Sequence, residues 1–133
     1  MLHFILDFAF LPISVKGIVF EQDIVWLRLN ERNEWELPGG RLEQGENPKE
    51  TVVRELHEEL GFEVNVEKIV HAGVLFANKD PVFIIVYLCT IMNKTGNFEL
   101  MGEAGPAQFP AFSPIEKVNL NIPHLYKEAL QRA

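Results

Sequence analysis

The amino-acid sequence predicts an α/β protein in which helices pack on both faces of a mixed β-sheet. Three observations lead to this fold class: β-branched and apolar runs typical of strands, one strongly patterned helix after a glycine-rich stretch, and an amphipathic segment at the end of the chain. Strands and helices in this order bury their apolar surfaces when helices cover both faces of the sheet. A chain of 133 residues is expected to form a single domain, residues 1–133.

The first forty residues contain the segments expected to form early strands and turns. Residues 1–14 are interpreted as an early strand, because Asp7 interrupts their apolar run and no basic residue precedes it, unlike a targeting signal. Residues 13–20 and 24–29 are apolar or β-branched and flank a polar turn, which predicts a hairpin. Residues 38–40, Pro-Gly-Gly, are predicted to form a loop.

The clearest helix of the sequence begins after Asn47. Asn47 is a suitable N-cap, and Pro48 suits the first helical position. An apolar stripe follows at a spacing of four residues, formed by Val52, Leu56 and Leu60. Gly61 is expected to end the helix, since glycine readily adopts the left-handed conformation found after the last turn.

The second half of the chain is expected to contain two long strands and a closing helix. Residues 69–77 and 82–92 are predicted to be strands, and the second is so uniformly apolar that we place it in the centre of the sheet. A shorter strand is predicted over residues 97–101 and a short helical turn near residues 113–116. A final amphipathic helix is predicted over residues 124–132.

Charge and cysteine content narrow the classes of function. The formal net charge of −7 argues against general nucleic-acid binding, which needs a basic face to displace counterions from phosphates. The single cysteine, Cys89, lies in an apolar run and is interpreted as a buried small side chain, which is compatible with a cytoplasmic protein. No segment is expected to cross a membrane, because the apolar opening stretch is too short.

The predicted helix carries three closely spaced carboxylates. Glu55, Glu58 and Glu59 stand at positions i, i+3 and i+4, which places them on one side of the helix, and we expect this side to be its exposed, acidic edge. Like charges packed together repel, but carboxylate oxygens are the ligands that hard divalent cations prefer. Arg54 stands four residues before Glu58 and is expected to offset and orient part of this cluster. The pattern therefore favours a metal site over a merely solvated helix face.

The residues around this helix resemble the signature of the Nudix hydrolase family. Gly40 is followed by five residues and Glu46, and seven more residues lead to Arg54, Glu55 and Leu56. After one further residue come Glu58 and Glu59, and the motif ends with Gly61 and the apolar Phe62. The segment Trp35 to Gly39 also resembles the family's usual lead-in. We call residues 40–62 the Nudix box.

The resemblance implies a fold, an activity and a set of site residues. It implies an α/β/α sandwich, and hydrolysis of a nucleoside diphosphate linked to another group with Mg²⁺ or Mn²⁺ as cofactor. The implied metal ligands are Glu55, Glu58 and Glu59 with the Gly40 carbonyl. The resemblance also implies that Arg54 and Glu46 pair to hold the loop against the helix, and that Gly61 turns the chain sharply.

The general base and the phosphate-binding residues are less well defined by the sequence. Candidates for the base are Glu59, Glu58 and Glu103, in that order, because family members place it either in the box or in a downstream loop. Glu99 is a rival to Glu103 for the loop position. Arg28 and Arg41 flank the glycine-rich loop and are candidates for contact with substrate phosphates, with ordinary surface positions as the alternative.

The substrate is not specified by the Nudix box. A proline that marks ADP-ribose hydrolases is absent, since residues 76–78 occupy the corresponding region. The chain's size and plain box favour a nucleoside triphosphate or related nucleotide as a small-molecule substrate, and leave a homodimer open. The main alternative is a non-catalytic module that binds a nucleotide and regulates another protein, and an isomerase or a non-nucleotide diphosphate hydrolase is a third.

Overall fold

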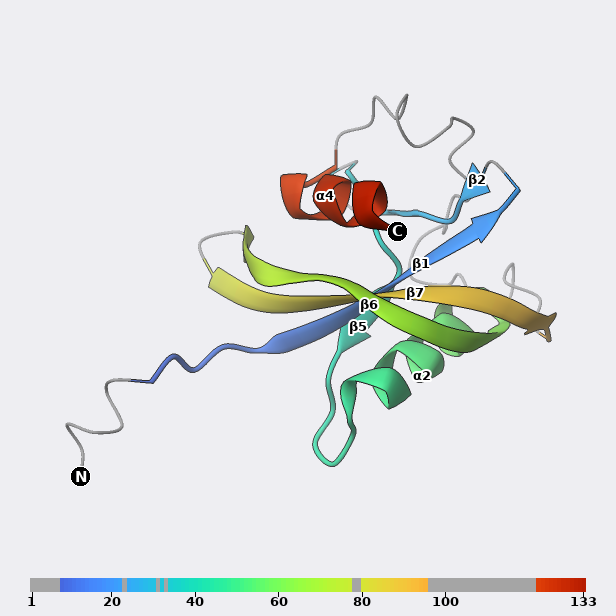
Figure 1. Cartoon of the computed structure of the whole chain (residues 1–133). Coiled ribbons are helices and arrows are strands. Elements are labelled where there is room, and N and C mark those ends of the chain that lie inside the picture. The colour runs from blue at the N-terminus through green and yellow to red at the C-terminus, as the bar shows by residue number, and fades with distance from the viewer. Residues whose placement is uncertain (1–7, 23, 31, 33, 78–79, 96–121) are drawn as a thin grey trace.

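The computed structural model describes residues 8–22, 24–30, 32, 34–77, 80–95 and 122–133 (Figure 1). No helix among these residues is long and apolar enough to cross a membrane. The elements they form are β1 (Ile13–Glu21), β2 (Ile24–Val25), β3 (Arg28–Leu29), β4 (Trp35–Glu36), β5 (Gly39–Arg41), α2 (Pro48–Leu60), β6 (Phe62–Ala77), β7 (Asp80–Lys94) and α4 (His124–Arg132).

The strands form a five-stranded mixed sheet and a separate pairing of β3 with β4. β7 runs parallel to β1 on one side and antiparallel to β6 on the other, so the prediction of a central strand over residues 82–92 is confirmed. The other edge of β1 pairs antiparallel with β5 near its start and with β2 near its end. The predicted hairpin between residues 13–20 and the following strand is therefore present.

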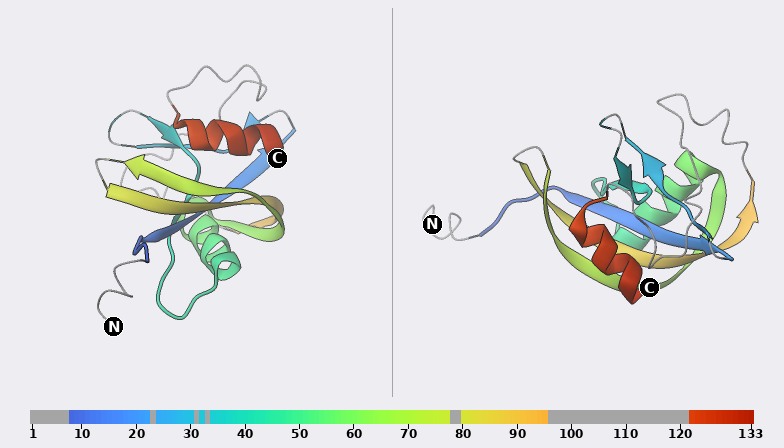
Figure 2. Two further views of the ribbon diagram at one scale, coloured as in Figure 1. Left: turned by 60° about the vertical axis from the view of Figure 1, so that its left-hand side comes forward. Right: turned by 90° about the horizontal axis from the view of Figure 1, so that it is seen from above.

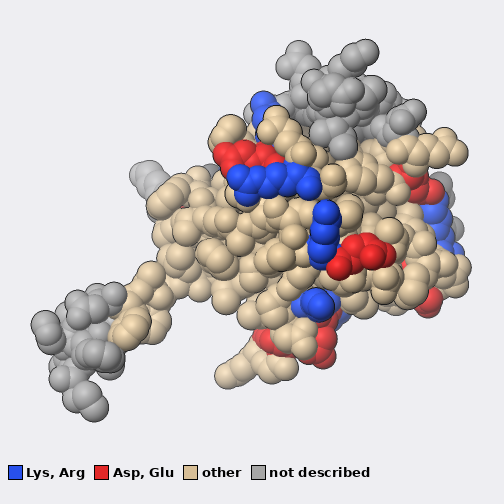
Figure 3. All heavy atoms as spheres, viewed as in Figure 1, with Lys and Arg blue, Asp and Glu red and all other residues tan. Residues whose placement is uncertain are grey.

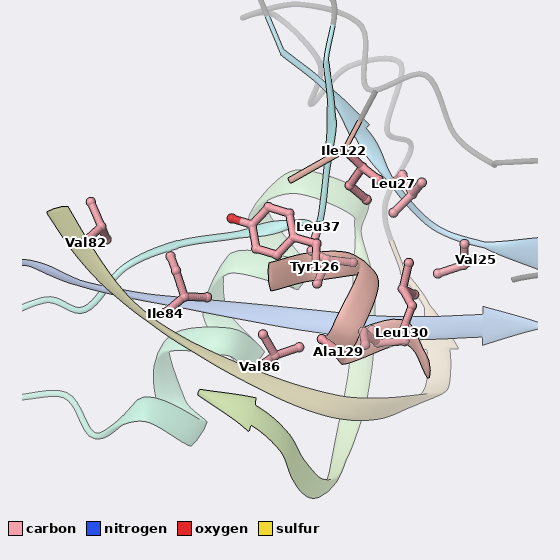
Figure 4. Close-up of a cluster of buried hydrophobic side chains, with 11 residues drawn as sticks. Val25, Leu27, Leu37, Val82, Ile84, Val86, Ile122, Tyr126, Ala129 and Leu130 are labelled. Carbon is pink, nitrogen blue, oxygen red and sulfur yellow. The ribbon is translucent and has the colours of Figure 1, made fainter. Parts of the chain in front are cut away.

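The two helices among the described residues cover opposite faces of the sheet, which confirms the predicted fold class (Figures 1 and 2). Beneath α2, buried side chains of the helix pack against β1, β6 and β7; this cluster includes Val15, Val19, Val52, Leu56, Leu60, Phe62 and Cys89. On the other face, α4 packs on a second cluster, which includes Ile18, Val25, Leu27, Leu37, Ile84, Val86, Tyr126, Ala129 and Leu130 (Figure 4).

Helix α2 begins and ends as the sequence predicts. The Asn47 side chain accepts a hydrogen bond from the backbone N–H of Glu50 at 3.0 Å, and the Glu50 carboxylate accepts one from the Asn47 N–H at 3.0 Å. Gly61 follows the helix with a φ of 71°, and its N–H donates to the His57 carbonyl. These hydrogen bonds at the two ends of α2 satisfy backbone groups that a helix end leaves without partners.

Several predicted boundaries are wrong. Residues 38–40 are not entirely loop, because Gly39 to Arg41 pair with β1; Gly39 has a φ of 146°, and a Cβ there would overlap the Val15 carbonyl oxygen. Within the predicted early strand, residues 13 and 14 belong to β1, but residues 8–12 are not strand, since Pro12 lacks an N–H for the ladder and β1 starts at Ile13.

Two further strands differ from their predicted extent. The run 24–29 divides into β2 and β3, because the chain leaves β1 and Arg28–Leu29 pair with β4 instead. β6 begins at Phe62 rather than residue 69, since its first residues alternate apolar with polar, as expected of a strand with one exposed face. The strand predicted at 97–101 and the helical turn near 113–116 lie outside the described residues.

Candidate active site

The acidic edge of α2 lies against the glycine pair of β5. The Glu55 carboxylate packs directly on Gly40, so closely that a Cβ at this position would overlap it. Glu59 Oε1 accepts a hydrogen bond of 3.0 Å from the backbone N–H of Gly39. Two of the three carboxylates predicted to bind metal therefore gather at the glycine pair, where only residues without side chains leave room for them.

The third carboxylate, Glu58, is held apart by an arginine. Arg54 Nη1 donates to Glu55 Oε1 at 3.0 Å and to Glu58 Oε2 at 3.3 Å, so one guanidinium nitrogen lies between the two carboxylates. As the side chains stand, no three histidine, cysteine or acidic groups in the described part of the chain are arranged to hold a metal ion. Glu58 is 57% exposed, which leaves its side chain room to turn away from Arg54.

Arg54 and Glu46 form the pair that the sequence predicts. Arg54 donates two hydrogen bonds to the Glu46 carboxylate, at 2.7 Å from Nε and 3.0 Å from Nη2. The bond to Arg54 is the main reason that the pKa of Glu46 falls to about 2. Arg54 Nη2 also donates to the Arg41 carbonyl at 3.3 Å. Together with the bidentate pair to Glu46, this bond ties the loop after β5 to α2.

Glu59 is more enclosed than the sequence indicates. The expectation that it lies on the exposed acidic edge with Glu58 is wrong, because the last turn of α2 lies beneath Gly39 and leaves the Glu59 side chain only 20% exposed. Burial raises the pKa of Glu59 to about 7, and the charge of Glu55 adds to the effect. The cations Lys16 and Arg28 and the Gly39 N–H oppose this rise without cancelling it.

A stability prediction follows from the raised pKa. In the unfolded chain Glu59 ionises near its usual pKa of 4.5, but in the folded protein it does so only near 7. The buried Glu59 carboxyl therefore lowers the free energy of unfolding progressively as the pH rises from 4.5 to 7. In metal-free buffer at pH 8, Glu59→Gln should raise the free energy of unfolding by roughly 1 to 3 kcal/mol.

This prediction is checked by thermal melting in a chelator at two pH values. The variant should melt at a higher temperature than the wild type at pH 8, whereas the two proteins should melt almost together at pH 4.5. Glutamine retains the oxygen that accepts the Gly39 N–H, so the change tests charge rather than hydrogen bonding. A variant that is less stable at pH 8 would contradict the assigned cost of burying this charge.

The structure brings one predicted phosphate-binding residue to the site and leaves the other outside. Arg28 forms an ion pair of 2.9 Å with Glu36 and approaches Glu59 Oε2 at 3.7 Å. The Arg41 side chain is exposed and makes no hydrogen bond or ion pair with another described residue. Glu103 and Glu99 lie outside the described residues.

Sequence reasoning missed Lys16, a buried lysine of β1. Its charge interacts with those of Glu36, Glu59 and Glu55, so it belongs to the same cluster of ionisable groups. The only sequence signal was a lysine in the middle of an apolar strand, where charged residues are rarely enclosed. Elsewhere, basic and acidic side chains lie next to one another on the described surface seen in Figure 3, without a continuous basic patch.

Comparisons with known proteins agree with this geometry. Residues 11–116 match the family model of the NUDIX domain. A MutT-like protein of Streptomyces ambofaciens is 35% identical over 79 residues, which cover 58% of this chain and 50% of that protein. An 8-oxo-dGTP diphosphatase of Escherichia coli (strain K12) is 59% identical over 30 residues, or 23% of each chain. The matched segments thus span half or less of these relatives.

The fold is shared with solved structures. A MutT NUDIX hydrolase from Burkholderia pseudomallei superimposes with a TM-score of 0.73 at 19% identity, covering 94% of this chain and 99% of that chain. A MutT protein from Methanosarcina mazei Go1 has a TM-score of 0.71 at 22% identity, covering 91% of each chain. At this level of identity, the likeness establishes the arrangement of sheet and helices.

Proposed function

Since this chain belongs to the Nudix hydrolase family, we propose that it is a metal-dependent enzyme that cleaves the pyrophosphate linkage of a nucleoside diphosphate derivative. Water attacks phosphorus in the proposed reaction. The observation that carries the proposal is the packing of Glu55 and Glu59 against the glycine pair of β5. This arrangement gathers negative charge at one place on the sheet edge, at a cost to stability that a bound cation would offset.

The proposed cation ligands are the carboxylates of Glu55, Glu58 and Glu59 with the carbonyl of Gly40. This donor set fits Mg²⁺ or Mn²⁺, because all the ligand atoms are hard oxygens. Glu58 would leave Arg54 to join the other two, which its exposure permits. When bound, the cation supplies charge neutralisation at the diphosphate and lowers the pKa of nearby water.

The proposed roles of the remaining residues follow from their contacts. Glu59 is the leading candidate for the general base, because its side chain is largely enclosed next to the glycine pair that Glu55 also contacts. Arg54, held by Glu46, orients Glu55 and Glu58. Arg28, which lies next to Glu59, is the proposed contact for a substrate phosphate.

The proposed substrate is a nucleoside triphosphate or a related nucleotide. The support comes from the similarity to the MutT-like protein and to the 8-oxo-dGTP diphosphatase, whose name refers to a triphosphate. A single domain, a cytoplasmic location and a homodimer stay predictions.

The proposed function is tested by incubating the protein with magnesium and a panel of nucleoside triphosphates, ADP-ribose and other nucleotide diphosphates. Chromatography then identifies the products. We expect at least one nucleotide to be split into a nucleoside monophosphate and the remaining phosphate-bearing group. Binding of nucleotides without any cleavage would instead support the regulatory alternative.

Glu103 provides a separate prediction about the general base. If it supplies the base from a downstream loop, Glu103→Gln should lower turnover at least about ten-fold with little change in melting temperature, and Glu99→Gln should cost much less. The measurement is turnover across the alkaline pH range beside thermal melting. If Glu103→Gln is as fast as wild type throughout that range, the base belongs to the Nudix box.

A further inference from the structure

Lys16 lies in the middle of β1 with only 8% of its surface exposed. Side chains alternate between the two faces of a strand, and Gly17 faces α2, since a Cβ there would contact Leu56 and Val52. Ile18, on the other face, belongs to the cluster beneath α4. Lys16 shares the face of Ile18, so its side chain extends on the side of the sheet opposite α2.

The Lys16 side chain passes along Gly39, the residue of β5 whose N–H binds Glu59. Lys16 pairs with Gly39 across the strands β1 and β5, and a Cβ at Gly39 would lie 3.0 Å from Lys16 Cδ. The N–H of Gly39 donates to Glu59 Oε1. Lys16 thus approaches the glycine pair from the α4 side, whereas the carboxylates of the Nudix box approach it from α2.

The Lys16 ammonium has unused hydrogen-bonding capacity. It forms no hydrogen bond or ion pair with any residue that the structure describes. Burial lowers the pKa of Lys16, and the nearby charges of Glu36 and Glu59 oppose this change without cancelling it. Every fully enclosed side-chain nitrogen or oxygen among the same residues has a partner. The Nζ atom therefore keeps some contact with solvent, at a position where the rest of its side chain is enclosed.

A lysine whose side chain is enclosed and whose ammonium has no bonded partner among the described residues is unfavourable for folding alone. Burying an ammonium group costs free energy unless an anion or acceptor compensates it, and an apolar side chain would fill the same space at lower cost. The partner that this position lacks must accept hydrogen bonds and carry negative charge. A phosphate oxygen meets both needs, and lysine binds phosphate as a compact point charge with three donors.

We propose that Lys16 is a substrate-binding residue whose ammonium donates a hydrogen bond to a phosphate oxygen of the bound diphosphate, from the α4 side of β1. The inference rests on the proposed function, because it requires a diphosphate next to the Nudix box. In this proposal, the two sides of the glycine pair bind different groups. The carboxylates on the α2 side hold the cation, and Lys16 on the other side holds the phosphate directly.

The test compares wild type with Lys16→Met, which keeps the length of the side chain and removes its charge. Two probes are titrated by calorimetry in magnesium: inorganic pyrophosphate, and the uncleavable adenosine α,β-methylene diphosphate. Loss of one charge-assisted hydrogen bond should weaken the binding of both probes at least about ten-fold. Binding of Mn²⁺ alone, followed by electron paramagnetic resonance, should be unchanged or tighter, because a positive charge near Glu59 is removed.

Lys68→Met is the matched control, since it removes the same charge from an exposed position of β6 and should bind both probes as wild type does. Melting temperatures show whether each variant is folded, and Lys16→Gln is a second variant if methionine disturbs packing.

Three outcomes would overturn the proposal. Equal binding of pyrophosphate by folded Lys16 variants and wild type would show that Lys16 only balances the charge of Glu59. Weaker binding of the methylene analogue alone would assign Lys16 to the nucleoside. Absence of nucleotide cleavage and of probe binding in the wild type would remove the proposed function and this inference together.

Discussion

Glu58→Gln is expected to lower turnover by roughly 100-fold or more, the scale of losing one strong electrostatic contact with the transition state. The Glu58 carboxylate is more than half exposed, and its one described contact is the 3.3 Å ion pair with Arg54. Exposed pairs of this kind contribute little to stability. The melting temperature should therefore hardly change, which separates a functional loss from unfolding.

The matched control for this change is Glu63→Gln. Glu63 is an exposed glutamate just beyond the Nudix box, and its replacement removes the same charge from a neighbouring part of the surface. Turnover of both variants is measured at saturating magnesium beside thermal melting. If Glu58→Gln loses activity only in proportion to unfolded protein, or no more than Glu63→Gln, the metal-binding interpretation of Glu58 is wrong.

Removal of divalent cations should abolish hydrolysis altogether. Seven acidic residues and only two basic ones lie between Glu43 and Glu63, so this segment has a strong excess of negative charge. Without a cation, the carboxylates of Glu55 and Glu59 would repel an incoming diphosphate. Activity should be lost in excess chelator and recovered when Mg²⁺ or Mn²⁺ is restored.

The same experiment has a readout that does not depend on activity. A cation that binds only the folded protein raises its melting temperature, so added magnesium should stabilise the wild type. Glu58→Gln should show a smaller shift, because one ligand is missing. Full turnover after exhaustive chelation would contradict the proposed role of the carboxylates.

Local signals account for the parts of the fold that the sequence predicts well. The bounds of α2 follow from Asn47, Pro48 and Gly61, whose effects act within one turn of the helix. The spacing of Glu55, Glu58 and Glu59 along that helix is likewise local, and it places them on one side without knowledge of any other element. The Nudix box was recognisable for this reason.

Features that depend on distant segments were not predicted. Pro38 to Gly40 has the composition of a loop, and only the open edge of β1 turns Gly39 to Arg41 into a strand. The burial of Glu59 and its raised pKa also depend on β5, because Gly39 lies against the last turn of α2. Lysine is usually a surface residue, and the enclosure of Lys16 results from the segments that pack around β1 on the α4 side.

The most direct test of the central claim is hydrolysis in ¹⁸O-labelled water with magnesium, followed by mass spectrometry of the products. If water attacks phosphorus at the pyrophosphate linkage, one of the two phosphate-bearing products should carry a single labelled oxygen on phosphorus, and the unlabelled partner should be the leaving group. The label should be absent from both products when magnesium is replaced by a chelator. Cleavage that leaves phosphorus unlabelled, or that proceeds equally without a divalent cation, would contradict the account.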